Sequence, residues 1–345
     1  MARRRAFDVW ARMFQRSLTA ITGSVLRESG RQVTRAMKPL REMSLPQRPL
    51  VKGSGDWIPG VALGPTGARR FRLYRPPDVK FGERLPLMVM LHGCGQTADS
   101  FAASTRMNRI ASRERFLVLY PEQDRLANAQ GCWNWFDTTK LRRAQGEAAL
   151  ILKAIDQVCL LHPVDRGRVA LVGLSAGASM ASLLATLHPE RFKAVVMHSG
   201  VPPGKAHSAI SALGAMHGRR ATVPLKATPQ TPSASWPPLL VIHGAADTVV
   251  SLENGRAAAQ MWSDAGRTAH ARPGRTVRRG KRYPMTVTDF KEGRRTVVTL
   301  VEVDRLGHAW SGGAGKQPFS DAQGPDASRL AWAFAARQFR AHGAG

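Results

Sequence analysis

One pentapeptide, at residues 173–177, does most to limit what this chain can fold into. Its sequence is Gly-Leu-Ser-Ala-Gly, with Ser175 at the centre. The apolar run before it, residues 168–172, predicts a buried strand, and the small residues and spaced leucines of residues 175–188 predict a helix. Glycines on both sides let the strand and the helix approach closely, so the serine is expected on a sharp turn with its hydroxyl exposed.

The chain after residue 65 alternates between strand and helix patterns, which implies a mainly parallel sheet flanked by helices. Further strands are predicted at residues 71–74, 87–91, 116–120, 194–197, 239–242 and 296–303, and a long helix at residues 144–161. A serine between a strand and a helix of such a sheet is the nucleophile elbow of α/β-hydrolases. We therefore predict an α/β-hydrolase catalytic domain over residues 66–342.

The first 65 residues differ from this domain. Residues 1–40 carry apolar side chains at helical spacing with arginines between them, which predicts a basic amphipathic helix. Such a helix can bind an anionic membrane or a granule surface, or dock on the protein itself. Residues 41–65 are rich in Pro and Gly and are predicted to be a linker. Arginines interrupt any uncharged core of a signal peptide, so we expect an uncleaved N-terminus.

Two insertions interrupt the alternating pattern. Residues 201–237 are rich in Pro, Ala and His and lie where hydrolases often carry a lid over the site. Residues 267–282 contain seven Arg or Lys and are predicted to form an exposed basic loop.

The charge of the whole chain is strongly positive. Among 345 residues, 51 are Lys or Arg and 24 are Asp or Glu, a formal net charge of +27. Such a charge attracts polyanions, including anionic lipid and nucleic acid. No helix-turn-helix, zinc-finger or RNA-binding signature is present, so specific nucleic-acid recognition is not expected. No apolar run reaches the roughly 18 residues of a membrane-spanning helix.

A serine hydroxyl needs a base to remove its proton and an acid to orient that base, in the chain order Ser, Asp or Glu, His. Asp247 is the first carboxylate after the predicted strand at residues 239–242, and His308 follows the strand at residues 296–303. We predict Ser175 as nucleophile, Asp247 as acid and His308 as base. The alternative acids are Glu253 and Asp264, and the competing histidines are His188, His198, His243 and His270.

Acyl transfer also needs hydrogen-bond donors for the developing oxyanion. The backbone amide of Ala176, directly after the nucleophile, is one candidate. The Gly-rich segment at residues 92–96 follows an early predicted strand and makes the Cys94 amide the second candidate. Cys94 and Cys132 both lie in Gly-rich loops and could meet, which would require an oxidising compartment. Cys159 falls in line with apolar residues on a helix face and is expected in the core.

Aromatic residues surround Cys132, in the segment Gly-Cys-Trp-Asn-Trp-Phe at residues 131–136. Aromatic side chains in a loop near a catalytic edge can line a pocket for an apolar substrate, or they can pack locally against the sheet. Trp133 and Trp135, together with Trp310 beside the predicted base, are the candidate substrate-binding residues.

These motifs, taken in order, resemble one family closely. The segments LHGCGQTADSF, YPEQ, GCWNWF, GLSAGASMA, HSGVPPG, HGAADTVV and GHAWSGG are similar to those of polyhydroxybutyrate depolymerase family esterases, over roughly residues 55–340. The resemblance implies the α/β-hydrolase fold and the triad Ser175, Asp247 and His308. It also implies that Cys94 lies near the oxyanion hole and is bonded to Cys132.

We therefore expect a serine esterase that needs no cofactor or metal and acts on a short-chain hydroxyalkanoate ester. The alternative within the class is an esterase for feruloyl or acetyl groups on polysaccharide. The alternative of another class is a protein that binds polyanions or granule surfaces on a hydrolase scaffold. The resemblance implies the extracellular region, and the expected uncleaved N-terminus favours a cytoplasmic or granule-associated protein instead.

Overall fold

The computed structural model describes residues 55–137, 143–218, 236–265 and 269–341. The chain divides into two units, Met1–Ser54 and Gly55–Gly345, and the second contains every element described below. The predicted amphipathic helix of residues 1–40, and the binding surface expected of it, lie outside the described residues. None of the described helices has the length and apolar character needed to cross a membrane.

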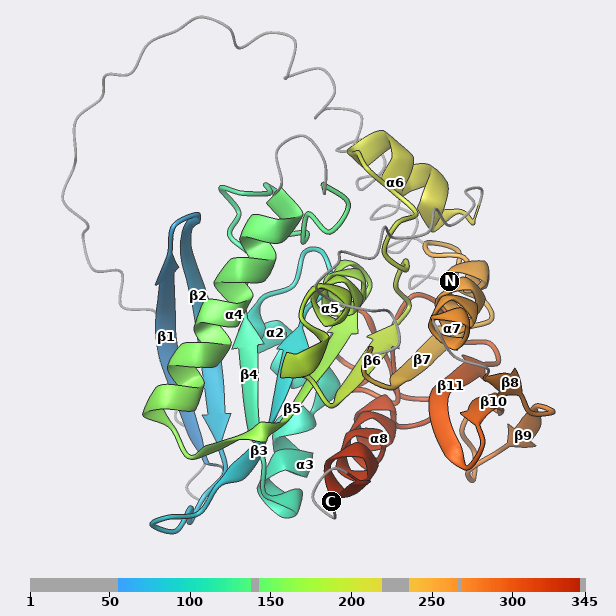
Figure 1. Cartoon of the computed structure of the whole chain (residues 1–345). Helices are drawn as coiled ribbons and strands as arrows, with labels where there is room; N and C mark the ends of the chain where they lie inside the picture. The colour runs from blue at the N-terminus through green and yellow to red at the C-terminus, as the bar shows by residue number, and fades with distance from the viewer. Residues whose placement is uncertain (1–54, 138–142, 219–235, 266–268, 342–345) are drawn as a thin grey trace, which may run out of the picture. The chain divides into compact units, whose positions relative to one another are not determined.

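A mixed sheet runs through the second unit (Figure 1). Its strands are β1 (Asp56–Gly64), β2 (Gly67–Arg75), β3 (Leu85–Leu91), β4 (Leu117–Pro121), β5 (Val164–Leu174), β6 (Ala194–His198), β7 (Leu239–Gly244), β8 (His270–Ala271), β9 (Arg275–Val277), β10 (Met285–Glu292) and β11 (Arg295–Val303). The spatial order is β1-β2-β4-β3-β5-β6-β7-β11-β10-β8, with β9 paired to β10. The central strands from β4 to β11 run parallel, as predicted.

Helices cover both faces of this sheet. They are α2 (Ala98–Thr105), α3 (Met107–Glu114), α4 (Arg143–Leu161), α5 (Ala176–Leu187), α6 (Ala209–Met216), α7 (Leu252–Asp264) and α8 (Ala327–Ala341), with a short 3-10 helix at Pro189–Arg191. Figure 1 shows α4, α5 and α7 over one face, while α2, α3 and α8 join the core on the other. Strands β3, β4, β6 and β7 are buried along their whole length, because helices cover them on both sides.

The predicted linker at residues 41–65 is wrong in its second part, because Asp56–Gly64 forms strand β1. Pro59 is tolerated there because β1 is an edge strand, where one side of the backbone needs no ladder hydrogen bonds. Gly60 is needed because a Cβ at this position would lie 2.2 Å from the ring of Phe71 on β2. Proline and glycine therefore mark an edge strand here.

The sheet also extends beyond the last predicted strand. Met285–Glu292 forms β10, which pairs antiparallel with β11. The predicted basic loop at residues 267–282 is exposed in its described part, but it contains β8 and β9, both paired to β10. Short polar strands at a sheet edge carry little hydrophobic periodicity, so the sequence pattern did not reveal them. A second, two-stranded sheet joins β12 (Trp310–Ser311) to β13 (Ser320–Asp321).

Candidate active site

Ser175 occupies the sharp turn that its sequence predicts, between the end of β5 and the start of α5. Its backbone angles are φ 55° and ψ −122°, a conformation that costs a non-glycine residue on the order of 1–3 kcal/mol. A Cβ at Gly173 would lie 2.2 Å from the carbonyl oxygen of Gly177, and one at Gly177 would lie 2.1 Å from that of Leu91. Both glycines are therefore required for the strand and the helix to meet at this turn.

Asp247 and His308 come together although 61 residues separate them. His308 Nδ1 lies 2.8 Å from Asp247 Oδ2, and both side chains are buried. The other oxygen, Asp247 Oδ1, accepts hydrogen bonds from the amides of Val249 and Val250 at 3.0 and 2.9 Å. Burial acts to raise the pKa of Asp247, but the attraction and hydrogen bond of His308, with smaller contributions from His243 and the Val250 amide, lower it to about 2. The carboxylate is thus charged at neutral pH.

The loops that carry these two residues are tied to each other by their backbones. The amides of Ala245 and Ala246 donate to the carbonyl oxygens of Val303 and Leu306, at 2.9 and 3.0 Å. A Cβ at Gly244 would lie 2.1 Å from the Leu306 carbonyl oxygen, so only glycine fits at the end of β7. The ends of β7 and β11 therefore hold Asp247 and His308 in register.

His198, one of the competing histidines, connects the elbow to the segment that follows His308. Its carbonyl oxygen accepts from the Ser175 amide at 2.9 Å, and its ring Nε2 accepts from the Ser311 amide at 3.1 Å. The ring is fully buried and stacks on Trp310, and burial lowers its pKa to about 3. It is a neutral hydrogen-bond acceptor that positions the backbone on both sides of the site.

His243 lies beside the same carboxylate. Its Nε2–H donates to the Val250 carbonyl oxygen at 2.8 Å and lies 3.6 Å from Asp247 Oδ2. Among the described residues its Nδ1 has no hydrogen-bond partner, and burial lowers its pKa. His243 is therefore neutral and packs next to Asp247, where the sequence had offered it as a competing base.

The remaining alternatives from the sequence lie elsewhere. Glu253 is exposed on α7 and forms an ion pair with Arg256, and Asp264 at the end of α7 accepts from Gln260. His188 follows α5, and His270 lies exposed in β8.

The candidate oxyanion donors follow β3 and Ser175. The amide of Gly93 donates to Gln96 Oε1 and that of Gly95 to the Gln130 carbonyl oxygen, both at 2.9 Å. Between them, the Cys94 amide has no acceptor among the described residues. Ala176 is the first residue of α5, a position whose amide has no partner within the helix.

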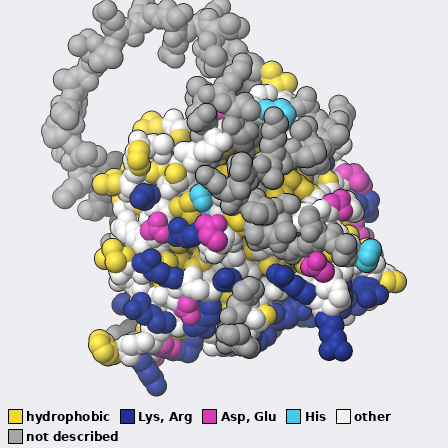
Figure 2. Space-filling model, viewed as in Figure 1, with side chains coloured by type: hydrophobic (Ala, Val, Ile, Leu, Met, Phe, Trp, Pro, Cys, Tyr) yellow, Lys and Arg dark blue, Asp and Glu magenta, His cyan; other side chains and the backbone are white. Residues whose placement is uncertain are grey.

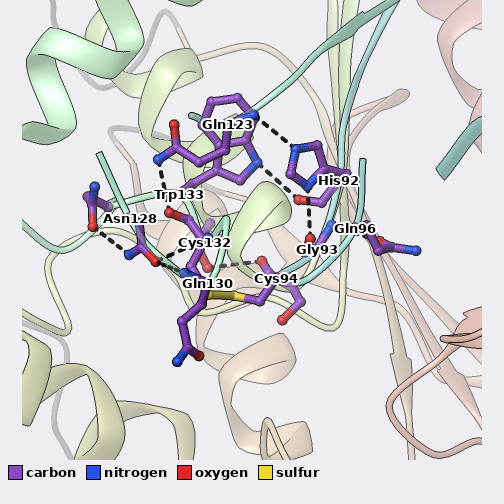
Figure 3. The surroundings of a disulfide bond; sticks show 12 residues. His92, Gly93, Cys94, Gln96, Gln123, Asn128, Gln130, Cys132 and Trp133 are labelled. Atoms are coloured by element: carbon purple, nitrogen blue, oxygen red, sulfur yellow. Dashed lines mark hydrogen bonds between the residues drawn. A yellow bond between two sulfur atoms is a disulfide. The ribbon is translucent and has the colours of Figure 1, made fainter. Parts of the chain in front are cut away.

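Cys94 is joined to Cys132 by a disulfide, as the family resemblance implied (Figure 3). The bond connects the segment after β3 to the loop before α4, and the two Cα atoms lie 4.3 Å apart. Cys159 is a free, buried cysteine on α4, as predicted.

A buried polar network that the sequence did not reveal supports these two segments. Glu147 on α4 accepts from Gln123 Nε2 at 2.7 Å, and from the Asn134 amide and side chain at 2.9 and 2.6 Å. Gln123 also donates to the Cys132 carbonyl oxygen, and its own amide donates to His92 Nε2. Burial raises the pKa of Glu147, against these hydrogen bonds and the nearby Arg69. In the sequence, the only sign of this network was Glu147, an acidic residue on the apolar face of the helix predicted at residues 144–161.

The tryptophans proposed as substrate contacts are buried. Trp133 and Trp310 have no exposed surface. Trp133 donates to the His92 carbonyl oxygen and lies under Arg69, while Trp310 donates to Ser328 Oγ and packs in the core. This burial argues against direct substrate contact by either side chain, and their role in binding stays a prediction. Trp135 is largely buried against Phe136, and its substrate contact stays a prediction.

Two further features concern the surroundings of the site. Of the predicted lid at residues 201–237, residues 219–235 lie outside the described residues, and the described part contains α6.

Within the described parts of the chain, no three His, Cys, Asp or Glu side chains are grouped as metal ligands.

Residues 69–277 match the family described as Esterase PHB depolymerase. The chain belongs to this family. Its match covers β2 to β9, including the elbow, the disulfide and Asp247, and ends before His308. A solved acetyl xylan esterase from Aspergillus awamori has the same fold, with a TM-score of 0.58 and 19% identity over 74% of this chain and 94% of that one.

Two curated relatives are similar in sequence. The chain is 38% identical to "Poly(3-hydroxyalkanoate) depolymerase C" of Paucimonas lemoignei over 131 residues, 38% of this chain and 31% of that protein. It is 27% identical to "Feruloyl esterase B" of Neurospora crassa over 209 residues, 56% of this chain and 69% of that protein. The chain thus spans less than a third of the length of the first relative.

Proposed function

We propose that this protein is a serine esterase that hydrolyses carboxylic esters through an acyl-enzyme. The observation that carries the proposal is the pair formed by Asp247 and His308, at the same edge of the sheet as the strained turn of Ser175. The chain order and the strand ends match those of a Ser, Asp, His triad. Membership of an esterase family supports the same conclusion.

The mechanism assigns one task to each residue. His308 takes the proton of the Ser175 hydroxyl as the oxygen attacks the ester carbonyl, and returns that proton to the leaving alcohol. Asp247 Oδ2 accepts from His308 Nδ1–H and keeps that proton in place, while the amides of Val249 and Val250 fix the orientation of the carboxylate. The amides of Cys94 and Ala176 donate to the developing oxyanion. Water, activated by His308, then releases the acid and regenerates Ser175.

The proposed substrate is an oligomer or polymer of a short-chain hydroxyalkanoate. Similarity to the Paucimonas lemoignei depolymerase supports this choice. Feruloyl or acetyl esters of polysaccharide are the second candidate, supported by the similarity to feruloyl esterase B. A side-by-side assay separates the two candidates, with polyhydroxybutyrate film, hydroxybutyrate oligomers, feruloyl esters and acetylated xylan as substrates. The highest kcat/KM on the hydroxybutyrate substrates would support the first candidate. The highest kcat/KM on the feruloyl or acetyl esters would reject it.

Hydrolysis of p-nitrophenyl butyrate tests the esterase activity itself. The wild-type protein should turn over this ester, and Ser175→Ala should reduce turnover by at least 10³-fold, because the attacking oxygen is removed. Thr276→Ala, which removes a hydroxyl at an exposed position of β9, is the control and should retain turnover. A Ser175→Ala variant as active as the wild type would contradict the proposal, and no turnover of any ester by the wild type would favour a purely binding role.

A further inference from the structure

A cavity of about 470 Å³ lies between α3, the start of α8 and the segment that leads into β10. None of the residues assigned to the proposed esterase site lines it. Six of its twelve lining residues are arginines: Arg106, Arg109, Arg113, Arg279, Arg282 and Arg329. The only acidic residue among them is Asp326, so the lining has a formal excess of five positive charges, six minus one.

Two of the arginines are fixed by neutral acceptors. Arg106 donates to the Gly312 carbonyl oxygen, and Arg282 donates to the Gly324 carbonyl oxygen at 2.6 Å. A carbonyl oxygen holds a guanidinium in place without cancelling its charge. These two side chains are half-buried, so their positions are set before any ligand arrives.

Two more arginines, Arg109 and Arg279, have no side-chain hydrogen bond or ion pair among the described residues. Within the described part of the chain, only Arg113 and Arg329 lie against carboxylates, those of Glu114 and Asp326. Asp326 is also occupied as the cap of α8, because its Oδ1 accepts from the Arg329 amide at 3.0 Å. Four of the six guanidiniums therefore carry charge that no carboxylate of the described chain neutralises.

The segments outside the described residues offer little acid to cancel this charge. They contain three acidic residues in total, Asp8, Glu28 and Glu42, whereas residues 1–54 alone contain twelve Lys or Arg. In the view of Figure 2, Lys and Arg side chains also gather over the lower half of the molecule, the end at which Figure 1 places α3. The excess positive charge of the lining therefore favours an anion as its ligand.

We propose that this cavity is a binding site for a small oligophosphate, a ligand with two or three linked phosphate groups. The planar fork of a guanidinium matches two oxygens of one phosphate, so arginines are well suited to this ligand. The volume exceeds that of one phosphate and lies within the range of small-molecule sites. A monocarboxylate, such as the acid released by an esterase, has one charge and leaves most of the guanidiniums without a partner. Inorganic polyphosphate and a nucleoside triphosphate share the recognised chemistry.

Isothermal titration calorimetry of the full-length protein tests the site, with tripolyphosphate, ATP and orthophosphate as ligands. Tripolyphosphate should bind at least tenfold more tightly than orthophosphate. ATP binding as tightly as tripolyphosphate shows that the phosphate chain carries recognition, and tighter ATP binding adds a nucleoside contact to the same site. ATP binding without tripolyphosphate binding, or no binding of either, would overturn the proposal.

Two double variants separate this site from the general positive charge. Arg109→Ala/Arg279→Ala removes two exposed, unpaired lining side chains and should weaken tripolyphosphate binding at least tenfold. Arg294→Ala/Arg295→Ala removes the same charge from exposed positions at the turn between β10 and β11, and should weaken it less than twofold. Equal losses in both variants would mean nonspecific attraction and reject the site. Ser175→Ala should bind like the wild type, so failure of the esterase proposal is distinguishable from failure of this one.

Discussion

The proposed active site has two sides that are held in place by different means. On the acid–base side, Asp247 and His308 are positioned by hydrogen bonds from backbone amides and by close packing of two strand ends. On the amide side, the segments around Cys94 and Cys132 are joined by a covalent bond and supported by the buried carboxyl of Glu147. The difference follows from chemistry: a base that moves a proton needs a charged, oriented partner, whereas an oxyanion donor needs only a fixed backbone.

The largest expected effect comes from Asp247→Asn. The new amide oxygen can still accept from Val249 and Val250, but the amide nitrogen that replaces Oδ2 is a donor and cannot accept from His308 Nδ1–H. His308 then adopts the other tautomer and loses its free Nε2 acceptor. The kcat for p-nitrophenyl butyrate should fall by about 10⁴-fold with little change in stability.

Glu253→Gln is the matched control for this substitution. It removes the next carboxylate along the chain, an exposed partner of Arg256, and should change kcat less than twofold. If Asp247→Asn kept more than a tenth of the wild-type activity while Glu253→Gln lost its activity, Glu253 and not Asp247 would be the acid of the triad.

Loss of the disulfide should have the next largest effect, and it should act on the amide side. Reduction with dithiothreitol removes a cross-link that closes a loop of 38 residues, and should lower the free energy of unfolding by about 2–4 kcal/mol. The kcat should fall with it, because the Cys94 amide is no longer fixed. Chemical denaturation and turnover measured with and without reductant give both effects.

Cysteine variants provide the control for this prediction. Cys94→Ser/Cys132→Ser should already have the lower stability and should not respond to dithiothreitol. Cys159→Ala keeps the disulfide and should respond like the wild type. If full reduction changed neither the stability nor the turnover of the wild type, the disulfide would not be needed to fix the Cys94 segment.

A smaller effect is expected from Glu147→Gln, which breaks the polar support of the same side. The new amide group places donors opposite those of Asn134 and Gln123, and should cost about 1–3 kcal/mol of stability. The control is Glu190→Gln at an exposed position, which should be neutral. A neutral Glu147→Gln in thermal and chemical unfolding would show that the network does not support the loop.

The last prediction concerns how stability changes with pH. Burial lowers the pKa of His92 to about 4 and that of His198 to about 3, so both stay neutral in the folded protein below pH 6.5, where the unfolded chain takes up protons. The free energy of unfolding should therefore fall as pH drops from about 6.5 to 4, by about 1.4 kcal/mol per pH unit for each histidine.

Urea denaturation at several pH values checks this slope. His198→Gln should reduce it by the amount of one proton, and His207→Gln, at an exposed position, should not. A wild-type slope of zero in this range would mean that neither buried histidine is held neutral.

The sequence was sufficient to predict the acid–base side. Ser175, Asp247 and His308 each follow an apolar strand run, and the carboxyl ends of parallel strands meet at one edge of the sheet, so the strand pattern was enough to predict that Asp247 and His308 meet. The catalytic roles of the three residues stay predictions. The burial of Trp133 and Trp310 was not predictable, because it depends on partners far away in the chain.

Other features lacked a local signal for similar reasons. β1 contains proline and glycine, which indicate a loop unless the strand is known to lie at an edge. The arginine cavity combines residues 105–113, 279–285 and 325–330, which no spacing rule connects. Contacts between distant segments decide these features, while the local pattern decided the elbow.

Labelling with a fluorophosphonate tests the central claim most directly, because this reagent bonds covalently to an activated serine. The site of attachment can be mapped by peptide mass spectrometry on the wild-type protein and on Asp247→Asn and His308→Ala. The account predicts one adduct, on Ser175, formed rapidly in the wild type and far more slowly in both variants. An active wild-type protein that carries no adduct on Ser175 would contradict the account. Equal labelling rates in the wild type and both variants would also contradict it.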